Sequence, residues 1–556
     1  MLLRLATRRK ASSVPPCPAC WVRSFRTPPV TLEHRHPAFR VLAGELASLP
    51  EFKTRGRDVR ILYDPADFYS TLLHRIANAR RRIFIASLYV GKEETELIQA
   101  LHDALEANPE LRVTMVLDYL RSTRETPNPS SASLVASLAA SFPGRVEIRL
   151  YHTPQLTGWR KRIIPRRFDE GWGLQHIKTY GFDDDVLLSG ANLSGDYFTN
   201  RQDRYIEFLS NTPLADYFSS LLSTISSFSF LATATDTSTK YPALTITWPI
   251  TNAAPSPLLS STSIPELKLI AHDSFTSLTQ SWASKPKSAL QSQLPWSPQE
   301  PKIYDTILRP VLQMGPFNIK QETELAVPSI FRAGNSLATA PGGGRTKIDW
   351  TSGYFSVQPA YRAKVLDSRA AVRIVAASPE VRANGFLNSK GVSKYIPPAY
   401  THLQRQFYDE ASRRAELKKK ESHVELREWK RKGWTYHAKG IWLTPSLGAT
   451  VRTPLESSPL TDPNERDHDI KMEHPLAPYL TLIGSSNYGR RSAERDLEAN
   501  LLLTTYSTEL RSDLQEEIHG IRKYAVDLVD DQLFARKERR VPWGVKVAAK
   551  AIETML

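Results

Sequence analysis

The chain is poor in two features that narrow its classification, cysteine and long apolar runs. It has only 2 cysteines in 556 residues, Cys17 and Cys20. Their Cys-x-x-Cys spacing lies among prolines and lacks partner ligands, so we expect no metal centre there. A run of about 18 apolar residues, which a membrane-spanning helix requires, is also absent. We therefore predict no transmembrane helix.

Acidic residues are missing from the start of the chain. Residues 1–32 contain no Asp or Glu, whereas basic residues are spread there among serine, alanine and apolar residues. This composition is typical of a mitochondrial transit peptide, and the continuous apolar core of a secretory signal is missing. We therefore expect residues 1–35 to be a transit peptide and the protein to reside in the mitochondrion.

The chain is basic overall. Its formal net charge of +15 becomes +9 when the six basic charges of the leader are removed. A basic protein suits an anionic partner, and both anionic lipid and nucleic acid meet that description. Residues 159–168 mix cations with aromatic side chains, as a loop that binds a membrane surface does. An ordinary solvated basic loop is the alternative explanation.

Two copies of a His-x-Lys motif are the most informative feature of the sequence. In each copy a turn of small residues ends in asparagine, and a carboxylate follows 11 residues after that asparagine. The offset is the same in both copies. The candidate catalytic residues are therefore His176, Lys178, Asn192 and Asp203 in the first copy, and His437, Lys439, Asn487 and Glu498 in the second.

These residue types suit the exchange of one phosphodiester ester for another. Apolar residues follow each motif, which predicts a strand, and on a strand positions i and i+2 share a face. Histidine and lysine would then point into one cavity. One imidazole can attack phosphorus while the other transfers protons. Lysine and asparagine can stabilise the phosphate oxygens, and a carboxylate can orient an imidazole.

The sequence alone leaves two points open. A lone histidine on a strand is more often structural than catalytic, and only the matching second copy favours catalysis. Whether each carboxylate pairs with the histidine of its own half or of the other half cannot be read from the spacing.

With these motifs the chain resembles the phospholipase D superfamily, whose signature is H-x-K-x4-D-x6-G-S-x-x-N or a near variant. The first copy keeps Asp183, and its turn reads Ser-Gly-Ala-Asn instead of Gly-Ser-x-Asn. The second copy has Thr444 in place of the aspartate and a long polar insertion before Gly484. The resemblance implies a catalytic place for Asp183, while structural support is its more conservative role.

Within the superfamily the chain is most similar to the eukaryotic CDP-diacylglycerol–glycerol-3-phosphate 3-phosphatidyltransferases, through residues 188–194, 197–205, 484–487 and 495–500. The resemblance implies phosphatidyl transfer through a phosphatidyl-histidine, on the route to phosphatidylglycerol and cardiolipin. It implies His176 as nucleophile and His437 as acid and base. The chemistry requires no metal or other cofactor, although assistance by a divalent cation stays open. The implied location is peripheral on the anionic inner mitochondrial membrane, with no nucleic-acid partner.

Other functions fit the same residues. A phospholipase D hydrolase or a cardiolipin synthase would differ only in the acceptor, and a tyrosyl-DNA phosphodiesterase-like nuclease would explain the basic charge. A non-catalytic binding module would require both motif sets to be vestigial. If glycerol 3-phosphate is the acceptor, the arginines that follow the catalytic turns are candidates to bind its phosphate. Alternatively, they form salt bridges with nearby acidic residues. They are Arg201, Arg204, Arg490 and Arg491.

Alternating strand and helix patterns predict an α/β layered fold. We expect two phospholipase D-like halves, residues 36–248 and 302–535, to form one pseudo-symmetric catalytic unit. A Pro/Ser-rich linker at 249–301, part-ordered because it contains Trp282 and Trp296, would join them, and a basic amphipathic segment would follow at 536–556. The dense charges of residues 397–432 predict a solvated long helix.

Overall fold

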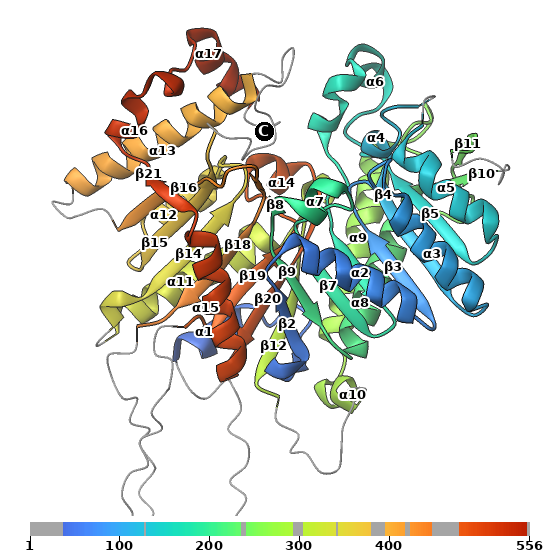
Figure 1. The fold of residues 1–556 in the computed structure, drawn as a ribbon, viewed down its shortest axis with the longest axis horizontal. Coiled ribbons are helices and arrows are strands. Elements are labelled where there is room, and N and C mark those ends of the chain that lie inside the picture. The colour runs from blue at the N-terminus through green and yellow to red at the C-terminus, as the bar shows by residue number, and fades with distance from the viewer. Residues whose placement is uncertain are drawn as a thin grey trace, which may run out of the picture.

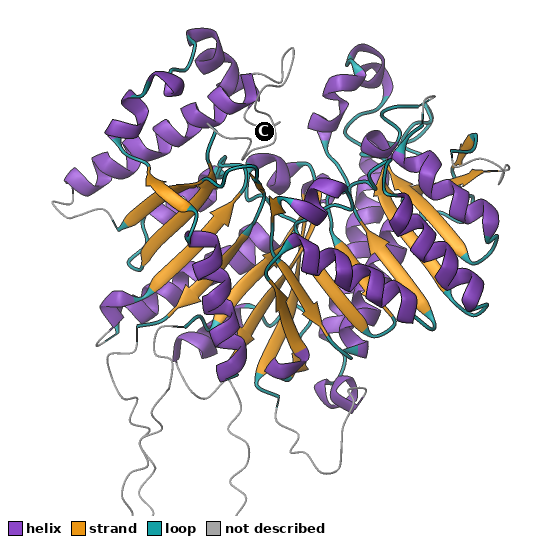
Figure 2. Ribbon diagram, viewed as in Figure 1, coloured by secondary structure: helices purple, strands orange, loops and turns teal. Residues whose placement is uncertain are grey.

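The computed structural model describes residues 37–126, 129–234, 241–292, 304–340, 343–379, 395–417, 423–446 and 477–552. The predicted transit peptide and most of the insertion before Gly484 lie outside these residues. Two large sheets stand side by side, blue to green and yellow to red in Figure 1, with helices packed around the strands in Figure 2.

The first half is built on a nine-stranded sheet of order β11-β10-β5-β4-β3-β6-β7-β9-β2. Its strands are β2 (Val59–Leu62), β3 (Arg82–Ala86), β4 (Arg112–Asp118), β5 (Val146–Tyr151), β6 (Thr179–Phe182), β7 (Asp185–Ser189), β9 (Tyr205–Phe208), β10 (Ser229–Ala234) and β11 (Leu244–Thr247). Its helices are α2 (Pro65–Asn78), α3 (Thr95–Ala107), α4 (Tyr119–Ser122), α5 (Ser131–Ser141), α6 (Gly158–Ile163), α7 (Gly195–Thr199) and α8 (Thr212–Ser226), with the 3-10 helices η2 (Gly56–Asp58) and η3 (Arg166–Trp172).

The second half is built on a ten-stranded sheet of order β1-β12-β20-β19-β18-β14-β15-β16-β21, with β13 beside β12. Its strands are β1 (Phe52–Thr54), β12 (Thr306–Met314), β13 (Ile319–Lys320), β14 (Lys347–Ser352), β15 (Ala371–Ala377), β16 (Val424–Trp429), β18 (Gly440–Thr444), β19 (Leu480–Gly484), β20 (Leu497–Thr505) and β21 (Ala525–Leu528). Its helices are α1 (Pro37–Glu45), α11 (Val327–Thr339), α12 (Pro359–Leu366), α13 (Ile396–Leu417), α14 (Arg490–Glu494), α15 (Thr508–Arg522), α16 (Asp531–Ala535) and α17 (Trp543–Ile552), with the short helices η4 (Gly315–Phe317), η5 (Glu322–Ala326), η6 (Gly343–Arg345) and η9 (Lys537–Arg539).

The two sheets repeat one topology strand by strand. β2-β9-β7-β6-β3-β4-β5-β10 of the first corresponds to β12-β20-β19-β18-β14-β15-β16-β21 of the second. In both, the three strands β3-β4-β5 or β14-β15-β16 pair in parallel and the other matched pairs are antiparallel. The predicted α/β fold of two related halves is confirmed.

Apolar runs explain the central strands. Residues 83–86 are all buried in β3, as are residues 374–377 in β15. Continuous burial of this kind is expected of parallel strands covered on both faces. A separate hydrophobic core lies in each half, and a third is shared between them, where Ile177 and Leu188 join Ala438 and Ile483. The shared core holds the halves together.

Two segments are placed differently from the sequence expectation, and the linker between the halves is ordered over two helices. Residues 37–54 were assigned to the first half, but α1 packs on α11 and β1 pairs with β12 of the second half. The region expected as a linker forms α9 (Ile264–Ala283) and α10 (Lys287–Ser292), and buries Phe275 in the shared core. The charged stretch is helical only as α13, because residues 424–429 form strand β16.

The C-terminal helix α17 docks on the protein. Val545 and Ala549 of α17 pack against Ala399 of α13. None of the helices in the described part of the chain is long and apolar enough to cross a membrane.

Candidate active site between the two halves

The two His-x-Lys motifs meet where the two sheets adjoin. His176 and Lys178 directly precede β6, and His437 and Lys439 directly precede β18. All four side chains are buried. The prediction that each motif is itself a strand is wrong: the motifs are short segments that lead into β6 and β18.

Backbone pairing across the halves brings each histidine to the other half's carboxylate. The His176 amide donates to the Leu497 carbonyl over 2.9 Å, and the His437 amide donates to the Gln202 carbonyl over 2.8 Å. Leu497 and Gln202 each precede a predicted carboxylate. The second contact belongs to a two-stranded parallel ribbon of β8 (Arg201–Gln202) and β17 (Thr435–Tyr436).

The imidazole–carboxylate pairs are therefore crossed. Nδ1 of His176 lies 3.0 Å from both carboxylate oxygens of Glu498. Nδ1 of His437 lies 2.7 Å from Oδ2 of Asp203. A proton on Nδ1 donated to a carboxylate leaves Nε2 available for reaction and raises the basicity of the ring. Neither half contains a complete site, because each histidine depends on the other half.

The lysines and asparagines complete the two sets. Lys178 Nζ donates to the His176 carbonyl over 2.7 Å, and Lys439 Nζ lies 2.7 Å from Nδ1 of His437 and 3.6 Å from Asp203. The side-chain oxygens Oδ1 of Asn192 and Asn487 are buried and have no hydrogen-bond partner in the structure. Such unsatisfied groups suit a site that receives a polar substrate.

The swapped small-residue turn has a steric cause. A Cβ on Gly190 would lie 2.5 Å from both Asp203 and Lys439 Nζ. In the second half the crowded position is instead Gly484, whose Cβ would lie 2.3 Å from Asn500 Oδ1. The glycine therefore comes second in the first turn and first in the second turn, because the close approach occurs at different places.

Burial dominates the electrostatics. Desolvation, together with the neighbouring lysine ammonium groups, lowers the pKa of His176 and of His437 well below its ordinary value. Desolvation raises the pKa of Glu498 to about 7, and Lys178 partly offsets that effect. Both imidazoles are consequently neutral near neutral pH, which is the form a nucleophile or a general base requires.

Charges around the two histidines differ. Two residues before Glu498 stands buried Asp496, which accepts a hydrogen bond from the Leu174 amide and pairs with Arg491 over 3.1 Å. At the matching place before Asp203 stands Arg201, whose guanidinium lies 4.6 Å from the Tyr197 ring centroid. The matched position therefore places a carboxylate near His176 and a cation near His437, while lysine ammonium groups act on both imidazoles.

Aromatic side chains surround His437 and were not predicted from the sequence. Tyr197 and Tyr354 meet its ring edge on, with centroids 5.2 Å and 5.6 Å away. The Tyr197 hydroxyl lies 3.5 Å from Nε2 of His437 and accepts from Asn192 over 3.1 Å. A repeated Ser-x-Tyr sequence at 87–89 and 352–354 could have pointed to Tyr354. In both copies the serine hydroxyl donates a hydrogen bond to the carbonyl of the tyrosine two residues later.

Asp183 does not belong to the site. It occupies the turn between β6 and β7, at the opposite end of β6 from His176. Its carboxylate accepts the backbone amides of Arg80, Arg81 and Arg82, which anchors the loop before β3. The catalytic assignment is corrected to structural support, and Thr444 stands at the matching turn of the second half.

The four candidate arginines separate into two groups. Arg201 and Arg491 adjoin the histidines, as described above. Arg204 is buried, forms a two-pronged ion pair with Glu517 over 2.8 Å, and stacks on Trp442, so it joins the halves and does not bind substrate. Arg490 is an exposed partner of Glu494 at 3.0 Å, which is the salt-bridge role that competed with phosphate binding.

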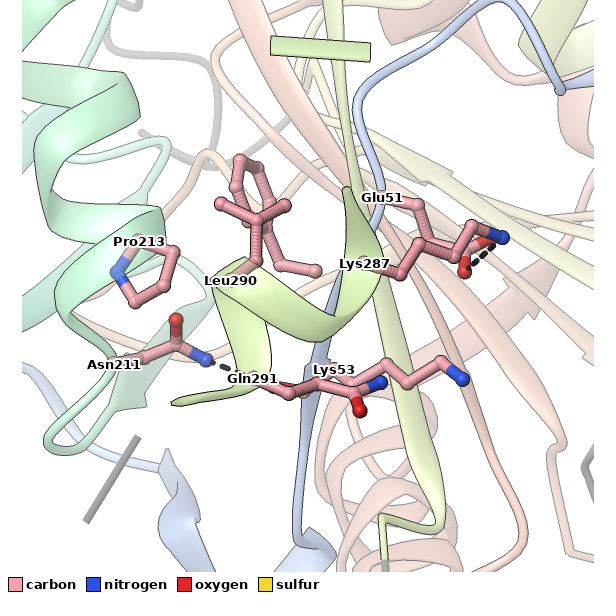
Figure 3. A pocket seen from close by; sticks show the side chains of 8 residues that line it. Glu51, Lys53, Asn211, Pro213, Lys287, Leu290 and Gln291 are labelled. Atoms are coloured by element: carbon pink, nitrogen blue, oxygen red, sulfur yellow. Dashed lines mark hydrogen bonds and ion pairs between the residues drawn. The ribbon is translucent and has the colours of Figure 1, made fainter. Parts of the chain in front are cut away.

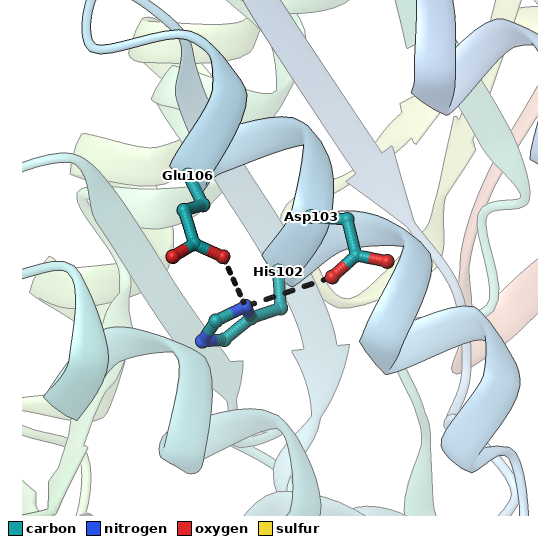
Figure 4. A group of neighbouring side chains, drawn as sticks. All are labelled: His102, Asp103 and Glu106. Atoms are coloured by element: carbon teal, nitrogen blue, oxygen red, sulfur yellow. Dashed lines mark ion pairs between the residues drawn. The ribbon is translucent and has the colours of Figure 1, made fainter.

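Two further features lie away from the site. The cavity in Figure 3 is lined by α10 and β1, and β1 pairs with the end of β12 opposite to Leu497. The group His102, Asp103 and Glu106 in Figure 4 sits on the outside of α3, with contacts of 3.9 Å. Short-range surface contacts of this kind lack the buried geometry of the paired histidines.

One group at the site has donor atoms close enough to hold a cation. Ligand atoms of His176, Asp496 and Glu498 lie within 4.8 Å of one another. Arg491 already pairs with Asp496, and Lys178 adds a positive charge beside Glu498. The protein thus supplies its own cations at this place.

Comparisons with known proteins agree with the geometry. No protein-family model matches the chain. A CDP-diacylglycerol–glycerol-3-phosphate 3-phosphatidyltransferase from Saccharomyces cerevisiae is 37% identical over 517 residues, 90% of this chain and 88% of its own. A Gallus gallus protein of that name, described as mitochondrial, is 35% identical over 521 residues, 91% of this chain and 85% of its own.

A solved structure supports the fold. The phosphatidylserine synthase of Haemophilus influenzae superimposes with a TM-score of 0.60, at 18% identity, over 94% of this chain and 100% of its own. At that identity the likeness concerns the fold alone. The sequence relatives carry the assignment: this chain belongs to the family of CDP-diacylglycerol–glycerol-3-phosphate 3-phosphatidyltransferases.

Proposed function

We propose that the protein transfers the phosphatidyl group of CDP-diacylglycerol to glycerol 3-phosphate, giving phosphatidylglycerophosphate and CMP. The observation that carries the proposal is the crossed arrangement of His176 with Glu498 and His437 with Asp203 in one buried site. Its acceptor and donor are the substrates in the family's name.

In the first step Nε2 of His176 attacks the phosphorus of the phosphatidyl group. The bond from that phosphorus to the CMP oxygen breaks, and His437 donates a proton to the departing CMP. Glu498, hydrogen-bonded to Nδ1 of His176, stabilises the positive charge that the imidazole gains. The pyrophosphate's negative charge raises the pKa of His437 on binding, which makes its proton-donor form accessible.

In the second step the primary hydroxyl of glycerol 3-phosphate attacks the phosphatidyl-histidine. Its proton passes to His437, the phosphorus–nitrogen bond breaks, and His176 is regenerated. Buried Asp496 near His176 supports its role as nucleophile, because negative charge raises the basicity of that imidazole, whereas Arg201 at the matching position lowers the pKa of His437. Lys178 and Lys439 are assigned to the phosphate oxygens, and Asn192 and Asn487 to the same oxygens through their amide nitrogens.

The product enters the route to phosphatidylglycerol and cardiolipin, and the protein acts at the surface of the inner mitochondrial membrane, to which its leader directs it. Supporting observations are the basic composition of the chain and the mitochondrial names of vertebrate relatives. No metal is required by these steps, and chelator in the assay tests whether a divalent cation assists.

One assay tests the proposal. The purified protein is offered CDP-diacylglycerol in detergent with water, glycerol 3-phosphate or phosphatidylglycerol as acceptor. We expect phosphatidylglycerophosphate with glycerol 3-phosphate and little product otherwise. Phosphatidic acid alone would identify a hydrolase, cardiolipin a cardiolipin synthase, and cleavage only of a phosphotyrosyl oligonucleotide the nuclease alternative.

A further inference from the structure

The end of the molecule that carries the site also carries a projection from each half (Figure 1). The first projection is α6 with η3, residues 158–172, and the second is α17 on α13. In the picture, α7, α14 and β8, which adjoin the histidines, lie between them.

Both projections are joined to the catalytic groups by short paths. η3 ends at Trp172, and the chain continues directly to His176. On the other side Tyr400 of α13 stacks on Tyr354 with centroids 5.7 Å apart, and Tyr354 meets His437. Each projection therefore begins next to the catalytic groups.

The first projection has an inverted distribution of polar and apolar side chains. Lys161 of α6 turns inward, where its Nζ lies 2.9 Å from Nε2 of buried His152. Trp159 and Ile163 of the same helix turn outward and are 66% and 65% exposed, and Phe168 of η3 is 41% exposed. A surface that meets only water normally shows the opposite distribution.

The second projection is apolar on two faces. Val545 and Ala549 of α17 face α13, as described above. Trp543 and Val547 face away from the protein and are 79% and 56% exposed. Burial against α13 therefore uses only part of the apolar surface of this helix.

Cations accompany the outward apolar side chains on both projections. Arg160, Arg162 and Arg166 are exposed on the first, and Lys546 and Arg540 are exposed on or beside the second. Apolar side chains among exposed cations complement an anionic bilayer, whose hydrocarbon takes up the former and whose headgroups attract the latter.

We propose that the two projections insert their outward apolar side chains into one anionic bilayer at the same time, so that the site opens to the membrane between them. The inference rests on the proposed function in that the lipid substrate enters from that bilayer. Simultaneous attachment makes the second contact intramolecular, so the pair binds more tightly than either projection alone.

Vesicle co-sedimentation of the full chain tests the proposal. The probes are phosphatidylcholine vesicles with and without cardiolipin. One variant carries Trp159→Ser with Ile163→Ser, another Trp543→Ser with Val547→Ser, and a third combines all four changes. We expect each double variant to lower partitioning onto cardiolipin vesicles about tenfold and the combination about a hundredfold.

A matched control changes two exposed valines outside both projections, Val41→Ser with Val526→Ser, which are 55% and 60% exposed. It should bind as the parent does. The proposal would be overturned if only one of the two double variants bound vesicles more weakly, or if the control lost as much vesicle binding as the projection variants. So would binding of single-stranded DNA without binding to vesicles.

A second measurement does not depend on affinity. With Cys17 and Cys20 replaced by serine, a polarity-sensitive dye is attached at Ile163→Cys, Val547→Cys or Val41→Cys. Cardiolipin vesicles should shift the emission of the first two to the blue and leave the third unchanged. A shift at only one projection contradicts two-point insertion. Activity on detergent-dispersed CDP-diacylglycerol is measured separately, so that failure of the proposed function is distinguished from failure of attachment.

Discussion

The two halves share one topology, yet their histidines occupy different electrostatic surroundings. Lysine ammonium groups act on both imidazoles, but buried Asp496 lies near His176, whereas Arg201 stands at the matching position near His437. The contrast arises mainly at one matched position, Asp496 in the second half and Arg201 in the first. Duplication therefore explains why two imidazoles are present, and divergence around them explains how they can take different roles. The predictions below test that contrast.

Removing the imidazoles should have the largest effect. We expect His176→Ala to abolish product and the trapped phosphatidyl-enzyme, and His437→Ala to slow formation and turnover by about 100-fold to 10,000-fold. Labelled lipid with an alkaline quench, which preserves a phosphorus–nitrogen bond, measures trapping. An unchanged urea unfolding midpoint serves as the control for folding. Label retained in His176→Ala and lost in His437→Ala would reverse the assignment.

Neutralising the carboxylates tests whether the crossed pairs act as orienting groups. Glu498→Gln and Asp203→Asn should each lower kcat by about 100-fold to 10,000-fold, the upper value being the loss for Asp→Asn in a Ser-His-Asp triad.

The pH profile separates the two carboxylates. Burial raises the pKa of Glu498 to about 7, so protonation of this carboxylate as pH falls removes the charge that supports His176; Glu498→Gln abolishes that titration, so the acid limb of kcat/KM moves to lower pH. A limb that moves to higher pH in Glu498→Gln would contradict the pairing. Asp496→Asn should move the limb in the same direction by less, because Arg491 already pairs with that carboxylate.

Replacing two arginines that are close in sequence should affect different properties, stability in one case and acceptor binding in the other. Arg204→Met leaves Glu517 buried without its ion-pair partner and should lower the free energy of unfolding by about 3–5 kcal/mol. Arg201→Met should leave stability nearly unchanged and raise KM for glycerol 3-phosphate by about tenfold, the value of one charged hydrogen bond. Urea unfolding and initial rates measure the two effects. An equal rise in KM for CDP-diacylglycerol would place the acceptor phosphate elsewhere.

The smallest effect is expected at Arg490. Its ion pair with Glu494 is exposed, so Arg490→Ala should change stability by less than about 1 kcal/mol and leave both KM values unchanged. Arg491→Ala is the matched comparison. It removes the ion-pair partner of buried Asp496 near His176 and should therefore lower activity. Equal activity of the two variants would contradict the assignment of Arg491 to the site and of Arg490 to the surface.

Much of the fold could be predicted from local patterns. The predicted alternation of strands and helices is realised, for example, in β5, where apolar and charged residues alternate, and in β15, where residues 374–377 are a continuous buried apolar run. Strand β16 was missed, since its alternation of charged and apolar residues at 424–429 continues the charge pattern of α13. Backbone hydrogen bonds to the neighbouring strands β15 and β21 decide that segment, and this is tertiary context.

The sequence by itself determined which residues are candidates for the chemistry, because two His-x-Lys motifs with matched asparagines and carboxylates specify those side chains whatever the path of the chain. Tertiary structure alone decided their partners. Gln175 pairs with Leu497, and Tyr436 pairs with Gln202. These two pairings bring each carboxylate to the histidine of the other half. Spacing along one chain carries no information on such contacts, since residues more than 200 positions apart meet through sheet packing. The same reason moved Asp183 and Arg204 from the site to structural roles.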